Sequence, residues 1–317
     1  MERRDVMSRP DRRATDPGAF SHAAFLYQDE DEYLGVLDEF AGVAADGPVQ
    51  AVLSLANPRR ANAALSAMSP RTLVTDMAGL GRNPARLIPA GLSFASEYPG
   101  EHVRCLWEPA WPDRSPEELT EIARHEALCN LAFADQPMTL LCLYDVSQLS
   151  EETMERVEAT HPVLISARRQ QSSATYPGAG VMPPGCDEPL PEPRQGAESL
   201  GFTDHLAAVR VFAARHATAA GLSPARTRDL TLAVSEIAAN ALGYASGGTI
   251  RAWRNEGELI CQIEDAGHIR DPLAGYRKQS ADVPGGHGLW LVNLVCDLVE
   301  RRTGETGTVT RLHMRVT

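Results

Sequence analysis

Between Ser21 and about Ala167, short apolar runs alternate with longer amphipathic runs. The apolar runs predict strands at residues 49–55, 72–76, 103–107, 138–143 and 163–166. The amphipathic runs predict helices at residues 29–45, 58–68, 84–96, 116–131 and 151–160. Pro58, Pro84 and Pro116 suit the first turns of three of these helices. Regular alternation of strand and helix predicts an α/β domain with a mainly parallel sheet covered by helices.

A second α/β pattern occupies the C-terminal part of the chain. After a predicted helix at residues 204–220, Ser223 and Pro224 form a helix start signal that opens a long helix. The long helix has a narrow apolar stripe formed by Leu230, Val234, Ile237 and Ala241. The pattern continues with predicted strands at residues 249–254 and 258–265, a helix at 289–298 and a strand at 309–315. It predicts a layer of helices packed on a sheet.

Proline, glycine, serine and glutamine dominate residues 168–198, which separate the two patterns. This composition predicts a flexible, extended linker. Residues 1–19 are rich in arginine and contain no apolar run of the kind a signal peptide requires, so they are predicted to be a disordered tail. The predicted organisation is therefore a tail (1–19), a first domain (20–167), a linker (168–198) and a second domain (199–317).

The composition restricts the class of protein. The 317 residues are 43% hydrophobic and 23% charged, and no apolar run approaches the roughly 18 residues of a membrane span. The net charge of −12 disfavours contact with phosphate backbones, so direct nucleic-acid binding is not expected. The six cysteines form no C-x-x-C pair, which predicts buried, reduced thiols. We therefore expect a cytoplasmic protein that binds neither membranes nor nucleic acid.

Three groups of residues in the second domain indicate candidate chemistry. Glu236 and Asn240 lie one helical turn apart, where a carboxylate and an amide can hold Mg²⁺ and orient a hydroxyl group. Asp265 and Gly267 come at the end of a predicted strand. A glycine-rich run then opens the next helix, where backbone amides can approach an anion closely. This run consists of Gly285, Gly286, His287, Gly288 and Leu289.

In this order and spacing, the motifs Ser235-Glu236-x-x-x-Asn240, Asp265-x-Gly267 and the glycine-rich run resemble those of the GHKL ATPases. They are most similar to the anti-sigma factor serine kinases of the RsbW and SpoIIAB type, over about residues 199–317. The resemblance implies a Bergerat α/β two-layer fold that binds ATP and Mg²⁺. It implies that Asn240 helps hold Mg²⁺, that Asp265 reads the adenine amino group and that Glu236 is the catalytic base. Residues 270–284 would form the ATP lid.

Several short sequences in the first domain are dense in polar and aromatic residues. They are residues 81–86, 107–111, 124–130 and 142–145, together with His22 and the Thr160-His161-Pro162 sequence. These sequences resemble the MEDS domain, a sensory module named after the regulator DcmR of methylotrophs, over roughly residues 20–165. The resemblance implies a sensory role and fixes no ligand. A Walker A motif is absent, so a nucleotide is not expected in this domain.

Residues of this first domain form a candidate sensory pocket: His22, Glu108, Trp111, His125, Tyr144 and Asp145. Ligands usually bind at the carboxyl ends of parallel strands, and Glu108 and Asp145 follow predicted strands. In the alternative interpretation, His125 and Glu126 pack against a helix or lie on the surface, and the tryptophans belong to the core. A metal site built from three histidines and a carboxylate is compatible with the residue types, although no spacing is diagnostic. Its histidines would be His22, His125 and His161.

These features predict a signal-responsive anti-sigma factor. It would bind ATP and Mg²⁺, phosphorylate a serine or threonine of a STAS-type anti-anti-sigma protein, and so control the availability of a sigma factor. A homodimer and an unidentified small-molecule signal at the first domain are also expected. Two alternatives stay open: a non-catalytic, ATP-dependent protein that sequesters the sigma factor, and a protein similar to a sensor histidine kinase. For the latter, the sequence around His205 lacks the basic residue and the proline usual at an acceptor histidine.

Overall fold

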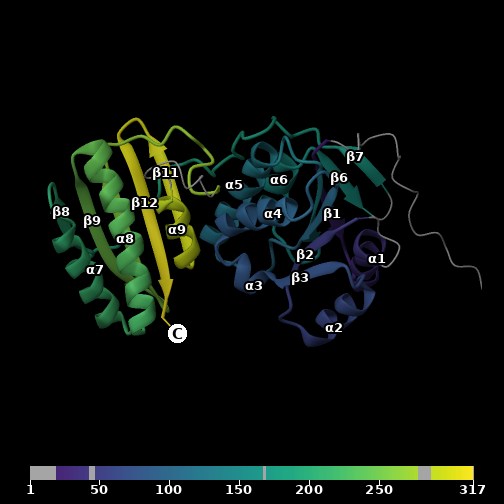
Figure 1. Ribbon diagram of the computed structural model, residues 1–317, viewed down its shortest axis with the longest axis horizontal. Coiled ribbons are helices and arrows are strands. Elements are labelled where there is room, and N and C mark those ends of the chain that lie inside the picture. The colour runs from purple at the N-terminus through teal and green to yellow at the C-terminus, as the bar shows by residue number, and fades with distance from the viewer. Residues whose placement is uncertain (1–18, 43–46, 167–168, 278–286, 317) are drawn as a thin grey trace, which may run out of the picture. The chain divides into compact units, whose positions relative to one another are not determined.

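The computed structural model describes residues 19–42, 47–166, 169–277 and 287–316. The chain divides into two compact units, Met1–Cys186 and Asp187–Thr317, each with its own sheet (Figure 1). Nearly all of the predicted N-terminal tail lies outside the described residues. No helix in the described ranges has both the length and the apolar character needed to cross a membrane.

The first unit contains a seven-stranded sheet in the order β3-β2-β4-β5-β1-β6-β7. Its strands are β1 (Ser21–Tyr27), β2 (Val49–Leu53), β3 (Thr72–Asp76), β4 (Val103–Trp107), β5 (Met138–Asp145), β6 (Val163–Ser166) and β7 (Arg169–Ser172). All neighbouring strands run parallel except β7, which pairs antiparallel with β6. The predicted mainly parallel α/β sheet is confirmed.

Helices cover both faces of this sheet (Figure 1). Those of the first unit are α1 (Glu30–Ala41), α2 (Pro58–Ala67), α3 (Met77–Leu80), α4 (Leu87–Ser96), α5 (Pro116–Ala132) and α6 (Glu151–Thr160), with a short 3-10 turn, η1 (Pro84–Arg86). Side chains alternate between the two faces of the sheet along each strand. Phe25 and Leu141 lie on the face that packs against α1 and α2. His22 and Cys142, on the same two strands, lie on the opposite face and contact Glu126 of α5.

Local signals define where these helices begin. Ser115 and Glu118 form a capping box before α5, with Pro116 in the first turn. The side chains of Asp29, Asn57 and Ser150 cap α1, α2 and α6. Each such cap contributes about 1 kcal/mol. These caps explain why the predicted starts of α1, α2, α5 and α6 agree with the structure to within a residue, whereas α4, which has no side-chain cap, begins three residues after the predicted start at Pro84.

The described residues of the predicted linker, 169–198, are divided between the two units. The start of this segment is β7, and Cys186 is fully buried where its carbonyl accepts a hydrogen bond from Arg124. The later part belongs to the second unit, in which Arg311 donates to the carbonyl of Pro191. Most of the described segment is exposed, and arginine side chains of the two units hold it through the carbonyls of Cys186 and Pro191.

The second unit contains a five-stranded antiparallel sheet in the order β11-β12-β10-β9-β8. Its strands are β8 (Glu198–Phe202), β9 (Gly248–Asn255), β10 (Glu258–Asp265), β11 (Leu298–Gly304) and β12 (Gly307–Arg315). Helices α7 (Leu206–Ala220), α8 (Pro224–Ala245) and α9 (Gly288–Val295) share one core with this sheet, and the predicted two-layer arrangement is confirmed (Figure 1). The predicted last helix continued to Leu298, whereas α9 ends at Val295 and β11 follows directly.

The sheet face opposite this core carries buried charged residues. His313 lies between two carboxylates, with Nδ1 at 3.3 Å from Glu258 and Nε2 at 2.9 Å from Glu300. Arg311 donates to Gln262 Oε1 as well as to the carbonyl of Pro191. This network joins the middle strands of the sheet to the segment that precedes β8.

The network makes the stability of the second unit dependent on pH. Burial alone would lower the pKa of His313, but the hydrogen bonds to Glu258 and Glu300 outweigh it and raise the pKa from 6.5 to about 9. Because the raised pKa belongs to the folded state, the stabilisation is complete below about pH 6.5 and is lost as the pH rises through about 9. We expect this histidine to account for a loss of about 2 to 3 kcal/mol of unfolding free energy over that range.

Urea unfolding of the intact chain across this pH range would check the expectation. His313→Gln should be less stable than the unmutated protein near neutral pH, and its unfolding free energy should fall less steeply toward alkaline pH. Equal pH slopes for the two proteins would show that other groups cause the alkaline loss.

Candidate functional site

Helix α8 positions the first group of candidate residues. Its N-cap Ser223 accepts a hydrogen bond from the backbone N–H of Arg226, and Pro224 occupies the first turn. The predicted apolar stripe is buried in the core of the second unit. Glu236 and Asn240 are half-buried on another part of the helix surface. Ser235 faces a different direction, because its hydroxyl accepts from Arg210 and donates to the carbonyl of Thr231.

The turn after β10 positions the second group. The backbone N–H of Gly267 donates to Asp265 Oδ1 at 2.8 Å, and the Thr308 hydroxyl donates to the Gly267 carbonyl at 2.7 Å. Burial raises the pKa of Asp265, and the Gly267 N–H partly opposes this effect. The second oxygen, Oδ2, has no protein donor among the described residues and can accept a hydrogen bond from a ligand.

A cavity of about 270 Å³ brings these elements together. It is lined by Ile237, Asn240, Tyr244, Asp265, Gly267, His268, Ile269, Arg270, Asp271, Ala274, Gly275, Leu289, Thr308 and Thr310. Of the predicted nucleotide-binding residues, Asn240, Asp265, Gly267 and Leu289 are therefore at one cavity. Thr308 and Thr310 were not predicted, although alternation along β12 places both on the sheet face that carries the core residue Leu312.

Glu236 lies against the start of α9. A Cβ atom added to Gly288 would be only 2.6 Å from Glu236 Oε2, so a glycine is required here unless the carboxylate moves. This contact places the carboxylate next to the first turn of α9, whose backbone N–H groups have no partner within the helix. His287 precedes the helix as its N-cap and makes no side-chain capping bond. Gly285 and Gly286 lie outside the described residues.

The beginning of the predicted lid is anchored to the second unit. Asn293 of α9 donates to the carbonyl of Gly275 at 3.0 Å, and Arg301 of β11 donates to the carbonyl of Ala274 at 2.7 Å. Leu273 and Tyr276 are buried. The sequence predicted a mobile lid over residues 270–284. Its described part, residues 270–277, is held in place by these contacts, and residues 278–284 lie outside the described residues.

A separate polar cluster lies inside the first unit, around Glu126 on α5. Its carboxylate Oε2 is 3.0 Å from His22 Nε2, 3.5 Å from His161 Nε2 and 3.4 Å from Cys142 Sγ. All four residues are at most 2% exposed. Burial would raise the pKa of Glu126, but its contacts with His161 and His22 outweigh burial and lower it.

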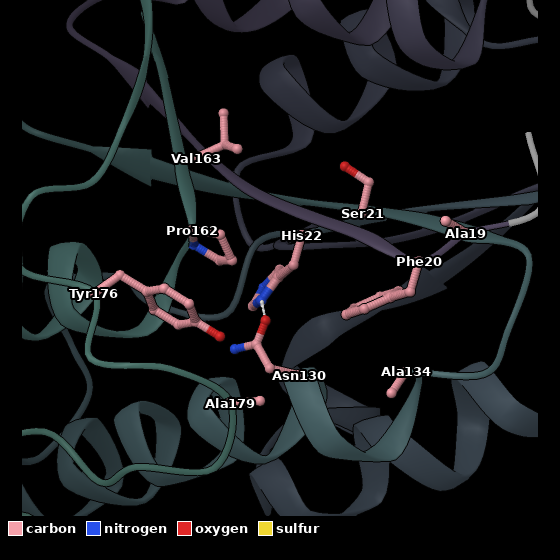
Figure 2. Close-up of a pocket in the computed structure, with 10 residues that line it drawn as sticks. All are labelled: Ala19, Phe20, Ser21, His22, Asn130, Ala134, Pro162, Val163, Tyr176 and Ala179. Atoms are coloured by element: carbon pink, nitrogen blue, oxygen red, sulfur yellow. Dashed lines mark hydrogen bonds between the residues drawn. The ribbon is translucent and has the colours of Figure 1, made fainter. Parts of the chain in front are cut away.

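Figure 2 shows a cavity of about 390 Å³ on the other side of His22. Its walls include Phe20, Asn130 and Tyr176, and the side chain of Asn130, a residue of α5, points toward the His22 ring. Tyr176 belongs to the segment that was predicted to be a linker. The cavity lies at the amino end of β1 and β6, opposite to the strand ends where a ligand was expected.

At the carboxyl ends of the strands, Glu108 forms a different cluster. It accepts hydrogen bonds from Arg60 at 2.8 Å, from Tyr27 at 3.3 Å and from the backbone N–H of Ser54 at 2.8 Å. Burial raises the pKa of Glu108, and Arg60 opposes the shift. Asp145 lines a neighbouring cavity of about 250 Å³ together with Tyr27 and Arg60.

The prediction of one sensory pocket is therefore wrong, because its six residues lie in different places. His22 borders the cavity of Figure 2. Tyr144 does not line this cavity, and its ring packs edge-on against the ring of His161, with 5.5 Å between the ring centroids. His125 is fully buried against Trp107 and Cys129. Glu108 and Asp145 are at the opposite ends of the strands, and Trp111 stacks with Arg114. The alternative interpretation, in which the tryptophans belong to the core, is correct for Trp107, whereas His125 is buried beside Trp107 and does not lie on the surface.

Comparisons with known proteins agree with the division into two units. Residues 21–162 match the model of the MEDS family, described as the methanogen/methylotroph DcmR sensory domain. Residues 202–314 match the model of the histidine kinase-like ATPase domain. No curated protein sequence matches the chain.

Two solved structures are also similar to parts of the chain. One is an ATPase domain that is 12% identical, with a TM-score of 0.32, over 47% of this chain and 69% of that one. The other, a prototypical ATPase from the type III secretion system of pathogenic bacteria, is 14% identical, with a TM-score of 0.31, over 47% of this chain and 51% of its own. TM-scores this low do not establish a common fold, so the family matches identify the domains. The chain joins a MEDS sensory domain to a histidine kinase-like ATPase domain.

Proposed function

We propose that the second domain is an ATP-dependent protein serine/threonine kinase whose substrate is a STAS-type anti-anti-sigma protein. In this proposal the chain sequesters a sigma factor while that partner is phosphorylated, and the MEDS domain supplies the regulatory input. The observation that carries the proposal is the position of Glu236. Its carboxylate lies at the first turn of α9 and one helical turn from Asn240, which lines the cavity.

The residues around the cavity fit a nucleotide with Mg²⁺. The Asp265 carboxylate offers an acceptor for an exocyclic amino group, and the Asn240 amide oxygen is a ligand type that Mg²⁺ accepts. The first turn of α9 offers backbone N–H groups to phosphate oxygens. When bound, ATP would supply the phosphoryl group and Mg²⁺ would neutralise its charge.

Glu236 would act on the substrate hydroxyl. A half-buried carboxylate beside the phosphate-binding end of a helix can accept the proton of a serine or threonine as its oxygen attacks phosphorus. The small residue at position 288 keeps this carboxylate close to the helix start. Asn240, one turn further along α8, lines the cavity and would hold the cation there.

The structure gives less support to a histidine kinase. Residues 169–205, all of which are described, contain no helix, so no separate acceptor helix precedes the ATPase domain there. His205 is the N-cap of α7 and its side chain is 83% exposed, near Asp204. These positions favour transfer to another protein over transfer to the histidine.

A phosphotransfer assay tests the proposal. The purified protein is incubated with labelled ATP and each STAS-domain protein encoded in its own genome. Label on a serine or threonine of one such partner would support a kinase. Label on none of them, with sigma binding still dependent on nucleotide, would favour the non-catalytic binder, and label on His205 or His216 would favour a histidine kinase.

A further inference from the structure

Four side chains of metal-ligand type converge in the interior of the MEDS domain. His22 comes from β1, Glu126 from α5, Cys142 from β5, and His161 from the residue that ends α6. One ligand atom from each lies within 4.8 Å of the others, and each residue is buried. Up to 139 positions of sequence separate these residues, which explains why no motif revealed them.

The distances fit one small tetrahedral ion. Zinc bonds of about 2.0 to 2.3 Å place neighbouring ligand atoms about 3.3 to 3.7 Å apart in a tetrahedron. Glu126 Oε2 is 3.0 Å from His22 Nε2, 3.5 Å from His161 Nε2 and 3.4 Å from Cys142 Sγ. Cys142 Sγ is 3.6 Å from His22 Nε2. Small adjustments of side chains would therefore complete the coordination.

The hydrogen bonds of His161 point its acceptor nitrogen toward the centre of the cluster. His161 Nδ1 is 2.8 Å from the carbonyl oxygen of Val157, which can only accept, so Nδ1 carries the proton. In the neutral ring, Nε2 then presents a lone pair toward Glu126. Among the described residues, this buried Nε2 has no hydrogen-bond partner.

Asn130 orients His22 in the same way. The Asn130 amide nitrogen donates to the carbonyls of Glu126 and Thr160, so its oxygen is left to accept from His22 Nδ1 at 3.1 Å (Figure 2). His22 Nε2 therefore also carries a lone pair in the neutral ring, and it faces the carboxylate at 3.0 Å. Second partners that fix a ring in this manner are typical of histidines that bind metals.

Two imidazole lone pairs and a carboxylate face one another in this buried site, an arrangement that favours a bound cation. A zinc ion with one thiolate and one carboxylate gives a site of zero net charge, which suits a dry interior. We propose that His22, Glu126, Cys142 and His161 bind one zinc ion.

Binding requires Cys142 to lose its proton. Burial raises the pKa of the Cys142 thiol, and the charge of Glu126 raises it further. Cys142 is therefore a protonated thiol when no cation is bound. On binding, a Zn–S bond replaces the S–H bond and the proton passes to solvent, without any change of oxidation state. Four protein ligands and full burial make the site closed, which is typical of structural zinc. It would fix β1, α5, β5 and the end of α6 to one another.

Metal analysis of the intact protein tests the zinc site. The purified chain should contain about one zinc per molecule, and removing it with a chelator should lower the unfolding temperature of the MEDS domain. After removal, Co²⁺ should bind one per chain and give the visible spectrum of a tetrahedral site, with a thiolate-to-cobalt charge-transfer band. Absence of stoichiometric Zn²⁺ and Co²⁺ binding by the unmutated chain would overturn the proposal, whatever the variants do.

Two cysteine variants locate the site. Cys142→Ser should abolish the charge-transfer band and weaken zinc binding by at least about 100-fold. Cys129→Ser is the matched control, because Cys129 is equally buried, contacts His125 and lies outside the cluster. Circular dichroism would verify that both variants fold. A charge-transfer band that survives in Cys142→Ser, or that is lost only in Cys129→Ser, would place the metal elsewhere and contradict the assignment.

Discussion

Replacing Glu236 by glutamine is expected to reduce phosphate transfer to the partner protein by about 10²- to 10⁴-fold, the usual contribution of a general base. Glutamine has nearly the same shape, so it can occupy the space beside Gly288 without disturbing α9. It cannot accept the proton of the substrate hydroxyl as a carboxylate does. ATP affinity should change little, because Glu236 is not among the residues that line the cavity.

The measurement is the initial rate of labelled phosphate transfer at saturating ATP. Glu256→Gln is a suitable control, because Glu256 is an exposed residue of the turn between β9 and β10 and is remote from the cavity lining. Its rate should equal that of the unmutated protein. If Glu236→Gln transferred phosphate as fast as this control, Glu236 would not be the base.

Asp265→Asn is expected to weaken ATP binding by about 10- to 100-fold, the range that follows from losing a hydrogen bond to a charged acceptor. An asparagine oxygen can still accept from the Gly267 N–H, but an amide N–H₂ group would then replace the second carboxylate oxygen. That group donates toward the adenine amino group, which is itself a donor. The ratio of ATP affinity to GTP affinity should also fall, because guanine carries an acceptor oxygen at the corresponding position, to which the asparagine N–H₂ group can donate.

Equilibrium dialysis with labelled ATP and GTP would measure both affinities. Asp271→Asn is the matched control, because Asp271 lines the rim of the same cavity and is exposed. It should leave the ATP to GTP ratio unchanged. An unchanged ratio in Asp265→Asn as well would mean that Asp265 does not read the base.

Local sequence signals predicted most of the fold. The Ser223 and Pro224 start signal and the apolar stripe located α8, and β3, β10 and α6 have the predicted bounds. Strand β1 was not predicted, because its central position in the sheet depends on pairing with β5 and β6 and not on its own alanine-rich sequence. Strand β11 was not predicted because only Cys296 and Asp297 separate the apolar run of α9 from it, too short a break to end the predicted helix.

The two candidate sites differ in how far the sequence reveals them. The ATP-site residues occur in short motifs on adjacent elements, so Asn240 and Asp265 could be predicted. The cluster around Glu126 depends on contacts that the sheet order creates between distant segments. Sequence reasoning considered His125 as a ligand, whereas the helical geometry of α5 turns its neighbour Glu126 toward His22 and His161. The same long-range packing places Glu108 with Arg60 at the other end of the strands.

Titration calorimetry with ATP and Mg²⁺ tests most directly whether the cavity of the second domain binds nucleotide. The unmutated intact protein, Asn240→Ala and Asp265→Asn would be titrated in parallel, with and without Mg²⁺. Binding at the cavity predicts one ATP per chain for the unmutated protein, weaker binding in both variants, and a smaller effect of Mg²⁺ in Asn240→Ala than in the other two proteins. Equal ATP affinity in all three proteins, or no saturable binding by the unmutated chain, would contradict a nucleotide site formed by Asn240 and Asp265.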